Sequence, residues 1–513
     1  MIKKIIAPRT RFYNSIKHFK FFMVFTLLFS SVLTINAQLC SCTIQEVQQN
    51  TVTPCNVTIG KTVTVSTTSE IRNAINQANS SGGNMTILIA DGSYQIASST
   101  SYPYITGNNI VIKSLSGKRD QVILSGGGMK PTSSTENVLG IAGNHITIAD
   151  LTIQDCGNHG IQVSGHHLFV HNVHFKNTYE QMLKGATDAN RIDSAIVQCS
   201  LFEYPNGIGP NYYIGGLDIH KGTNWTVRDN MFKNIKSPSG SVAEHAIHFW
   251  NQSSDNLIER NVIINCDRGI GFGLGNSPSQ GGIIRNNMIY NDGLGVFSDV
   301  GIGLENSPNT KVYNNTIFVA YQNAIEYRFA GTTNVDIRNN LTNKSIRSRD
   351  GGSGVNTNNV TNAQSNWFVN TSAGDLHLSS GLSNVVDQGI DLMPYITDDI
   401  DQNKRPQGIN IDIGADEYII KTNQKDIFNS SLDFQILPNP SSSGVFKLVK
   451  SNKLFSDTFN LSVHTLFGQQ IYETELGLNQ SNIEINLAAN PKGVYLLKLE
   501  YHNSIHCFKL VKL

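Results

Sequence analysis

The chain has 513 residues, several times the usual size of one domain, so two or three folded units are expected. Its 39 Lys and Arg balance 39 Asp and Glu, and only 15% of residues are charged, which argues against a polybasic nucleic-acid binder and against an acidic solvated tail. The 44 Gly and only 14 Pro favour short strands and tight turns, and 7 Cys are too few for a disulfide-built scaffold, so an all-β protein with its own core is predicted.

Residues 1–37 predict a signal peptide. Basic residues precede an apolar run at 21–35, and Ala37 offers a small residue for cleavage. The run is shorter than the roughly 20 residues that span a bilayer, so the mature protein is expected to carry no membrane span. A lipid anchor on Cys40 is the alternative, but Leu39 before it is not the small residue that lipoprotein processing prefers.

Residues 38–66 are expected to form an N-terminal linker. Cys40, Cys42 and Cys55 are available for pairing after export. Three further cysteines lie in strand-like segments and are expected to pack as small buried hydrophobes: Cys156, Cys199 and Cys266.

A helix is predicted at the start of the next unit. Thr67 and Glu70 form a capping-box pattern, and an apolar helical stripe follows. The stripe consists of Ile71, Ala74, Ile75 and Ala78. Such a helix would cover the open end of a strand stack, whose exposed edges otherwise invite aggregation.

A repeat runs from about residue 145 to 341, with segments such as HITIADLTI (145–153), LIERNVII (257–264) and VYNNTIF (312–318). Each segment has an alternating apolar pattern around one polar position. The polar column is Asp150, Asn172, Ser200, Asn230, Asn261, Asn287, Asn315 and Asn340. Asn tolerates left-handed backbone angles and can hydrogen-bond along a stack, so the column is interpreted as structural. The pattern predicts a right-handed parallel β-helix over residues 67–370.

A second set of strands lies between these segments, and alternation divides its outward side chains into two columns. The first column is Gln162, Met182, Asp218, His248, Gly271, Gly303 and Glu326. The second is Ser164, Lys184, His220, Trp250, Gly273, Glu305 and Arg328.

Neighbouring coils lie about 4.8 Å apart, so several chemically useful side chains should meet on this face. They are Lys184, Asp218, His220, His248 and Trp250. Asp218 and His220 share a face, as a base and its orienting carboxylate require, and Lys221 follows at the corner. A single polar residue here is usually solvated surface, but the combination predicts a functional site.

Glycines continue the same two columns. Gly271 and Gly273 are expected to leave a trough beside the patch, in which a sugar ring can lie. The structural alternative is that these glycines serve unusual backbone angles. The far wall of the trough is expected to present Glu305, Glu326 and Arg328.

A third column, on the adjoining strands, has alternating charge. It reads His171, Gln198, Arg228, Glu259, Arg285, Tyr313 and Arg338. We interpret Glu259, Arg285 and Arg338 as a stacked ion-pair ladder. Arg228 is the exception, since it lies near the corner after Lys221 and could reach a substrate carboxylate.

The C-terminal part divides into a closing coil segment at 371–418, a linker at 419–430 and a small β-sandwich domain at 431–513. The motifs LPNPSSSGVFKL, LSVHTLFGQQIYE, PKGVYLLKLE and HCFKLVKL of the last domain resemble the type A sorting domain of the Bacteroidetes type IX secretion system. The resemblance implies that the secretion machinery is a partner and that the protein is secreted or attached to the cell surface.

The coil pattern over roughly 60–370 resembles that of secreted β-helix polysaccharide lyases and alginate C5-epimerases. In the epimerases a D-P-H strand carries the catalytic Asp and His, and LDIHKG (217–222) resembles it with Ile219 in place of Pro. The Tyr expected three residues before the Asp is Gly215, with Tyr212 and Tyr213 nearby. Chondroitinase-B-like lyases use a Lys base, an Arg and calcium, which Lys221 and Arg228 match in part.

Both families begin by removing the C5 proton of a uronic acid, which needs a base and a cation on the carboxylate. We assign His220 as base and Asp218 as its orienting group. Lys221 or Lys184, with Arg228, would neutralise the carboxylate. His248 would be the acid or second proton-transfer group.

The predicted function is a polysaccharide lyase acting on an anionic, uronic-acid-containing polymer. A C5-epimerase is the first alternative. A glycoside hydrolase would pair Asp218 with Glu305 or Glu244, and a non-catalytic glycan binder would need only Trp250, the trough and the rim. A metal is not identified, and calcium on Asp267, Asp299 or Glu305 is a minor alternative.

Overall fold

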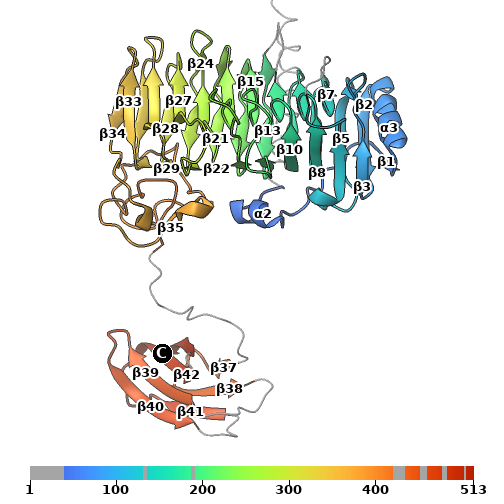
Figure 1. Ribbon diagram of the computed structural model, residues 1–513. Coiled ribbons are helices and arrows are strands. Elements are labelled where there is room, and N and C mark those ends of the chain that lie inside the picture. Colours follow the sequence, from blue (N-terminus) through green and yellow to red (C-terminus); the bar gives the residue numbers. More distant parts are fainter. Residues whose placement is uncertain are drawn as a thin grey trace, which may run out of the picture. The chain divides into compact units, whose positions relative to one another are not determined.

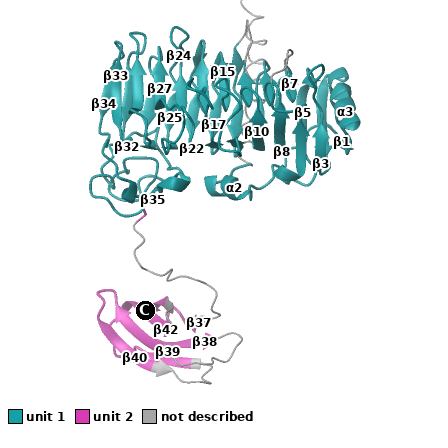
Figure 2. Ribbon diagram, in the orientation of Figure 1, with its two compact units in different colours: residues 1–418 teal, residues 419–513 magenta. Residues whose placement is uncertain are grey.

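The computed structural model describes residues 40–130, 136–185, 191–419, 434–450, 459–476, 482–501 and 504–513. The chain forms two compact units, residues 1–418 and 419–513 (Figure 2). The predicted signal peptide and nearly all of the predicted linker at 419–430 lie outside the described residues. Within the described part, no helix is long and apolar enough to cross a membrane.

Unit 1 is a stack of parallel coils (Figure 1). The candidate site lies on a ten-stranded parallel sheet, here called sheet C. Its strands are β4 (Tyr104–Ile105), β7 (Leu139–Ile141), β9 (Ile161–Val163), β11 (Leu183–Gly185), β15 (Leu217–His220), β19 (Ile247–Trp250), β23 (Ile270–Phe272), β27 (Val300–Glu305), β30 (Asn323–Arg328) and β33 (Ser345–Arg349).

The strands of the other two walls of the coils belong to one large parallel sheet, and each of these two walls is called a face here. One face contains β1 (Lys61–Val65), β2 (Gly83–Ile89), β5 (Asn108–Ser114), β13 (Ile196–Gln198), β17 (Thr226–Arg228), β21 (Leu257–Glu259), β25 (Ile283–Arg285), β28 (Lys311–Tyr313), β31 (Val335–Arg338) and β34 (Gly354–Thr357). The other contains β3 (Gly92–Gln95), β6 (Val122–Ser125), β14 (Leu201–Glu203), β18 (Met231–Lys233), β22 (Val262–Ile264), β26 (Met288–Tyr290), β29 (Thr316–Phe318) and β32 (Leu341–Thr342). Two long strands, β8 (Ile146–Cys156) and β10 (Phe169–Thr178), run through both faces.

Short strands mark the corner that follows sheet C, and two more pair near the end of the unit. The corner strands are β12 (Ile192–Asp193), β16 (Gly222–Thr223), β20 (Ser253–Ser254) and β24 (Ser279–Gln280). The pair near the end is β35 (Phe368–Asn370) with β36 (Asp375–Leu378), which are antiparallel.

The inward side chains stack from coil to coil into one core. Phe175, Phe202 and Phe232 lie on successive coils with ring centroids 4.6 Å apart. Trp225 is fully buried and its indole donates to the carbonyl of Ile192 at 2.9 Å, so this side chain packs in the core. The predicted all-β, parallel β-helix architecture is confirmed.

The Asn column forms a buried hydrogen-bond ladder, as predicted. From Asn230 to Asn340, the backbone N–H and Nδ2 of each column Asn both donate to Oδ1 of an Asn one coil later, for example those of Asn261 to Asn287. From the coil of Asn230 onward, the left-handed backbone angle belongs to the preceding residue, for example Asn286 with φ 54°. The ladder therefore satisfies buried backbone groups at a corner where strands cannot.

Helix α3 (Thr68–Ser80) buries the predicted stripe of Ile71, Ala74, Ile75 and Ala78 against the first coil, at one end of the stack (Figure 1). Thr67 accepts from the N–H of Glu70, but the Glu70 carboxylate accepts from Ser66, so the predicted capping box is completed one residue earlier.

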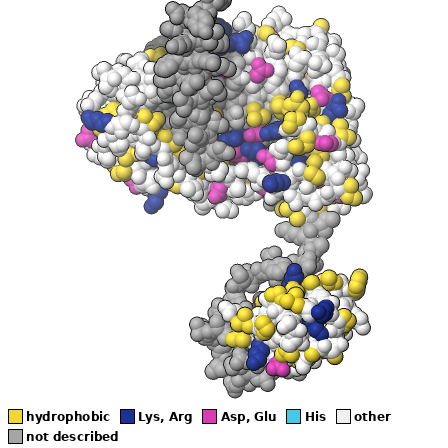
Figure 3. All heavy atoms as spheres, turned by 180° about the vertical axis from the view of Figure 1, so that it is seen from behind, with side chains coloured by type: hydrophobic (Ala, Val, Ile, Leu, Met, Phe, Trp, Pro, Cys, Tyr) yellow, Lys and Arg dark blue, Asp and Glu magenta, His cyan; other side chains and the backbone are white. Residues whose placement is uncertain are grey.

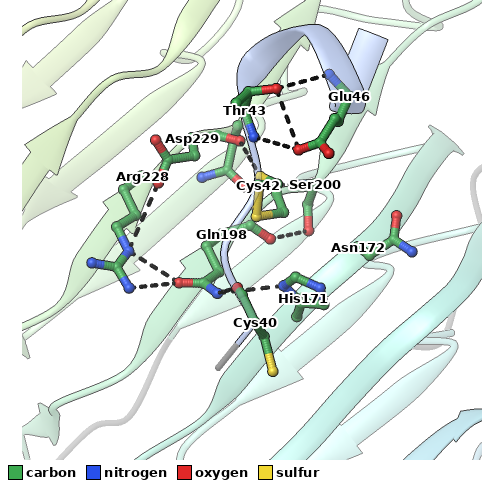
Figure 4. The surroundings of a disulfide bond; sticks show 12 residues. Cys40, Cys42, Thr43, Glu46, His171, Asn172, Gln198, Ser200, Arg228 and Asp229 are labelled. Atoms are coloured by element: carbon green, nitrogen blue, oxygen red, sulfur yellow. Dashed lines mark hydrogen bonds and ion pairs between the residues drawn. A yellow bond between two sulfur atoms is a disulfide. The ribbon is translucent and has the colours of Figure 1, made fainter. Parts of the chain in front are cut away.

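The N-terminal segment is tied to the stack by two disulfides. Cys40 pairs with Cys55. Cys42 pairs with Cys199, and Figure 4 shows the surroundings of this second bond. The interpretation of Cys199 as a free buried residue was therefore wrong, whereas Cys156 and Cys266 are free and buried as predicted. A short helix, α2 (Ile44–Gln49), follows Cys42.

Unit 2 is a small antiparallel β-sandwich. One sheet contains β37 (Phe434–Leu437), β38 (Val445–Lys450) and β41 (Asn482–Asn486). The other contains β39 (Phe459–Thr465), β40 (Gln470–Leu476), β42 (Gly493–Tyr501) and β43 (Ser504–Lys512). Both sheets supply side chains to one core, including Phe446, Ile485, Leu461 and Leu497, so unit 2 has its own hydrophobic interior.

Candidate functional site

The register of sheet C confirms most of the predicted outward columns. Asp218 pairs with His248, His248 with Gly271, Gly271 with Gly303, and Gly303 with Glu326. In the second column His220 pairs with Trp250, and Glu305 with Arg328.

Strand β11 departs from the predicted columns. Lys184 pairs with Gln162 and Asp218, so it belongs to the first column and not to that of His220. Met182, which was assigned to the first column, is fully buried in the core. Because Lys184 lies in the first column, its ammonium is directly beside the Asp218 carboxylate.

Lys184, Asp218 and Trp250 form a buried polar network. The Lys184 ammonium is ion-paired with Oδ2 of Asp218, and the two side chains are 8% and 3% exposed. The Trp250 indole N–H donates to Oδ1 of Asp218 at 2.6 Å. Burial alone would raise the pKa of Asp218, but the charges of Lys184 and His248 outweigh it and lower the pKa. Asp218 is thus a carboxylate held in place by its neighbours.

His220 lies on the solvent side of this network. Its Nε2 is 3.2 Å from the Lys184 ammonium and its ring centroid is 4.2 Å from that of Trp250. Burial and the nearby Lys184 charge lower the pKa of His220 to about 4, against a smaller opposite effect of Asp218. The imidazole is therefore neutral at neutral pH, and Nε2 is its acceptor, because an ammonium can only donate.

The expected direct contact between Asp218 and His220 is not formed. Both carboxylate oxygens of Asp218 are engaged by Lys184 and Trp250, and Lys184 lies between the carboxylate and the imidazole. Lys184, and not Asp218, contacts the predicted base.

His248 is fully buried, which does not suit the acid role that we assigned to it. Its Nε2 is 3.1 Å from the carbonyl of Gly273. Its Nδ1 lies 3.7 Å from Asp218 Oδ1 and 3.6 Å from Glu244 Oε2. A side chain with no exposed surface cannot donate a proton to a bound polymer.

The predicted trough is filled at Gly271. A Cβ there would lie 2.6 Å from Nε2 of His245, so the missing side chain admits this imidazole and not a sugar ring. His245 is buried, and desolvation, with the neighbouring His248 charge, lowers its pKa well below the usual value.

Gly273 also serves the backbone. It has φ +75°, and a Cβ would lie 1.7 Å from the carbonyl oxygen of Glu305. The alternative interpretation, that this glycine serves an unusual backbone angle, is confirmed. Its assignment to a substrate trough was wrong.

The expected far wall is closed by internal ion pairs. Arg328 lies 3.7 Å from Glu305, whose Oε2 accepts from the N–H of Gly275 at 2.6 Å. Glu326 is buried and pairs with Arg349 at 2.7 Å. The three residues share the face of sheet C, but they lie three or more strands from Asp218.

Of two further predicted site residues, Arg228 lies apart from the network and Lys221 lies near its His220. Arg228 projects from β17 of the large sheet and is bound to Gln198 at 2.9 and 3.0 Å, beneath the segment of Cys40 and Cys42 (Figure 4). Lys221 occupies the corner after β15 with φ 55°. Its charge contributes to the lowered pKa of His220, so it lies near the imidazole.

The column that contains Arg228 is partly an ion-pair ladder. Arg285 pairs with Glu259 at 2.5 Å, as predicted. Arg338 instead pairs with Asp336 on its own strand. On the face of unit 1 drawn in Figure 3, Lys or Arg and Asp or Glu side chains likewise lie next to one another on an otherwise mostly uncharged surface.

Three residues of the site were not among those assigned to the lyase site from the sequence, although Glu244 was named as a possible hydrolase carboxylate and Tyr213 as a neighbour of the expected Tyr position. Glu244 and His245 lie in the loop before β19, and His245 reaches over Gly271. Tyr213 lies in the loop before β15, close enough to Lys184 and Asp218 for both charges to act on its hydroxyl. Burial raises the pKa of Tyr213, so the hydroxyl stays protonated at neutral pH. The motif EHAIHFW carried the only signal for the first two.

Calcium, which the lyase resemblance implies, does not fit these residues. Among the described residues, the clusters of three or more potential ligands are Glu244–His245–His248 and His377–Asp401–Asp416. Neither contains Asp267, Asp299 or Glu305. Asp267 accepts from the backbone N–H groups of Ser237 and Ala243, and Asp299 pairs with Arg268. Calcium prefers oxygen ligands only, so we assign it no role.

A cavity of about 500 Å³ lies at the corner beyond β19. Its lining includes Arg191, Gln252, Ser254, Asn276 and Asn306, so it is mainly polar. Asn251, beside this lining in sequence, has its Nδ2 3.4 Å from Nδ1 of His220.

Comparisons with known proteins agree with this architecture. A family model described as right handed beta helix region matches residues 136–341 and 215–389, and the secretion system C-terminal sorting domain matches 435–512. The crystal structure of the pectate lyase Pel9A has a TM-score of 0.53 and 15% identity, covering 71% of this chain and 98% of that chain. An alginate lyase from Paenibacillus sp. str. FPU-7 has a TM-score of 0.40 and 15% identity, covering 59% and 98%. No curated protein matches the sequence.

At this level of identity the likeness to the pectate lyase concerns the fold. The sorting domain indicates export by type IX secretion to the cell surface or outside. The chain is a right-handed parallel β-helix protein with a polysaccharide-lyase-like fold and a C-terminal sorting domain.

Proposed function

We propose that the protein is a lyase that cleaves a uronic-acid-containing polysaccharide by β-elimination at the network of Lys184, Asp218, His220 and Trp250. One observation carries the proposal: an ammonium is held between a carboxylate and a neutral imidazole, beside an indole, on the outer face of the stack. The lyase-like fold and the export signal are in keeping with action on a polymer outside the cell.

The first requirement is a cation for the substrate carboxylate, because the carbanion at C5 is otherwise too unstable. Lys184 is the nearest candidate. It already bonds a carboxylate, Asp218, and an acceptor nitrogen, His220. A uronate carboxylate that competes for the ammonium would be neutralised and would release Nε2 of His220.

The second requirement is a base. His220 is neutral at neutral pH and sits between Lys184 and solvent, so its released Nε2 can take the C5 proton. The electron pair of the C5–H bond then forms the C4–C5 double bond, and the bond from C4 to the glycosidic oxygen breaks. Trp250 offers a partly exposed aromatic face against which a sugar ring can stack.

The third requirement is a proton for the departing oxygen. Tyr213 is 44% exposed, keeps its proton at neutral pH and lies near the network, so we assign it this role in place of His248. Tyr212, which is 54% exposed and adjacent, offers a matched control.

The test is incubation of the purified protein with a panel of polyuronates in deuterated buffer. Ultraviolet absorbance from an unsaturated uronate supports the lyase. Deuterium at C5 without absorbance would instead make the protein an epimerase, reducing ends without absorbance a hydrolase, and binding without product a glycan binder. His220→Gln is expected to lower turnover about 100- to 10,000-fold, and Tyr213→Phe by a similar order, whereas Tyr212→Phe keeps the normal rate. Normal rates in both His220→Gln and Tyr213→Phe would refute the assignment.

A further inference from the structure

Behind the proposed active site lies a second group of polar side chains that the β-elimination does not use. Glu244, His245 and His248 each offer one ligand atom, and these atoms lie within 4.8 Å of one another. Within this group, Glu244 Oε2 and His248 Nδ1 are 3.6 Å apart. Ligands about 2.1 Å from a tetrahedral metal ion are about 3.4 Å from one another, so little adjustment is needed to hold one.

Each of the three side chains has a buried atom without a hydrogen-bond partner among the described residues. These atoms are Glu244 Oε2, His245 Nδ1 and His248 Nδ1. Buried side-chain polar atoms in folded proteins usually have a partner, and each one without a partner calls for an explanation. Three such atoms on three side chains whose ligand atoms lie within 4.8 Å of one another are explained together by a bound cation.

The hydrogen bonding of His248 points the same way. Its Nε2 faces the carbonyl of Gly273 at 3.1 Å, and because a carbonyl only accepts, Nε2 carries the proton. Nδ1 is then the ring nitrogen left to bind a metal, and it faces Glu244 Oε2 at 3.6 Å and Asp218 Oδ1 at 3.7 Å. A cation bound at this nitrogen would be attracted by both carboxylates. A histidine whose second nitrogen donates to a carbonyl is also the usual arrangement of a metal ligand.

His245 is held in place by the glycines of sheet C. A Cβ on Gly271 would lie 2.6 Å from its Nε2, and one on Gly303 would lie 3.8 Å away. The ring centroids of His245 and His248 are 4.5 Å apart. Gly271, first interpreted as part of a substrate trough, and Gly303 therefore allow one imidazole to lie beside the other.

We infer that Glu244, His245 and His248 form a binding site for a divalent transition-metal ion, with Zn²⁺ as the ion that suits the ligands best. Two imidazoles and one carboxylate are a zinc ligand set, whereas calcium and magnesium prefer oxygen alone. Three protein ligands leave a fourth position to water or to another oxygen ligand. The inference does not depend on the proposed lyase activity, and Asp218 links the two sites as a neighbour of His248 and the partner of Lys184.

The second cluster of the chain, at His377, is not such a site. Its Nδ1 lies 2.6 Å from Asp375 and its Nε2 3.0 Å from Asp401, so both ring nitrogens are within hydrogen-bond reach of carboxylates. Protons on the two ring nitrogens account for these contacts without a metal. His377 therefore serves as a matched control for the metal-binding experiment.

The experiment is a titration of the purified, chelator-treated protein with Zn²⁺ by calorimetry, together with Co²⁺ as a spectroscopic probe. We expect one equivalent of Zn²⁺ to bind, visible Co²⁺ absorption bands, and no comparable binding of Ca²⁺. Glu244→Gln and His245→Gln should each weaken Zn²⁺ binding about 100-fold or more, since even residues that only orient ligands change affinity 10- to 100-fold. His377→Gln should leave it unchanged.

Gly271→Ala gives an independent test, because it displaces the ring of His245 without removing a ligand. It should weaken Zn²⁺ binding in protein whose circular dichroism is unaltered. The inference is overturned if no stoichiometric Zn²⁺ binds, if Ca²⁺ binds in its place, or if binding survives both Glu244→Gln and His245→Gln. Absence of lyase activity would leave these binding results unaffected, so the two proposals fail separately.

Discussion

Replacing Lys184 by Met tests the central ion pair of the site through protein stability. The change leaves Asp218, whose side chain is 3% exposed, as a buried carboxylate. Among the described residues, its remaining hydrogen-bond donor is the Trp250 indole N–H at 2.6 Å. Removing one partner of a buried ion pair costs about 3–5 kcal/mol, because the remaining charge is left without compensation. We therefore expect Lys184→Met to lower the free energy of unfolding by about that amount at pH 7.

The loss should depend on pH in a defined direction. In the native protein the pKa of Asp218 is below its ordinary 3.8, so the pair stabilises the fold above that pH and the stabilisation is lost as pH falls through the folded-state pKa. In the variant, burial acts without the Lys184 charge and raises the pKa of Asp218, so the carboxyl group becomes neutral more readily. The difference between variant and native protein should thus be largest near neutral pH and should shrink below about pH 4.

The assay is urea unfolding followed by circular dichroism, with two further variants. Lys184→Met combined with Asp218→Leu removes both charges and should recover most of the loss, since a buried pair can often be replaced by apolar residues. Arg338→Met is the matched control, because its pair with Asp336 is exposed (31% and 27%) and should cost less than about 1 kcal/mol. A loss below about 1 kcal/mol for Lys184→Met, constant between pH 4 and 7, would refute the reasoning.

Three further predictions concern other parts of the chain. Gly273→Ala should lower stability by about 1–3 kcal/mol, because the residue has φ +75° and its Cβ would meet a backbone oxygen; an unchanged melting temperature contradicts this. Burial acts to lower the pKa of His377, but hydrogen bonds to Asp375 and Asp401 raise it to about 11. The pKa values of Asp375 and Asp401 are lowered. The stability difference between native protein and His377→Gln should therefore be greatest between about pH 4 and 6.5 and should decrease toward pH 11; a difference that grows with pH excludes the ion pairs. Removal of residues 419–513 should leave the calorimetric transition of unit 1 in place, since each unit has its own core, and its disappearance would show that the units unfold as one.

Much of this architecture is readable from the sequence, because each coil repeats the same alternation of apolar and polar residues. The register of Asp218, His248 and Gly271 follows from placing the Ile and Leu positions inward, and the structure confirms it. The same rule fails at β11. Met182 and Leu183 are both apolar, so alternation cannot decide which faces the core, and Lys184 was placed beside the wrong neighbour.

The remaining differences arise from contacts between distant segments. Whether the space above Gly271 stays open depends on the path of the loop that carries His245, and that path is set by packing and not by a local pattern. The bond of Cys42 to Cys199 joins residues 157 positions apart, which no local spacing indicates. Arg228 resembles a substrate ligand in its own column, but the N-terminal segment covers that face (Figure 4).

The asparagine ladder also determines where the chain can change in length. From Ser200 onward, successive ladder residues are separated by 30, 31, 26, 28, 25 and 19 positions, although every rung has the same hydrogen bond from a backbone N–H to an Asn Oδ1. The variation is large in the loops that lead back into sheet C, which are long at 204–216 and 234–246 and short at 265–269 and 319–322. Tyr213, Glu244 and His245 all belong to the two long loops. Exchange of one such loop for another therefore offers a route to new chemistry on the same coils, with the strand register of its neighbours preserved.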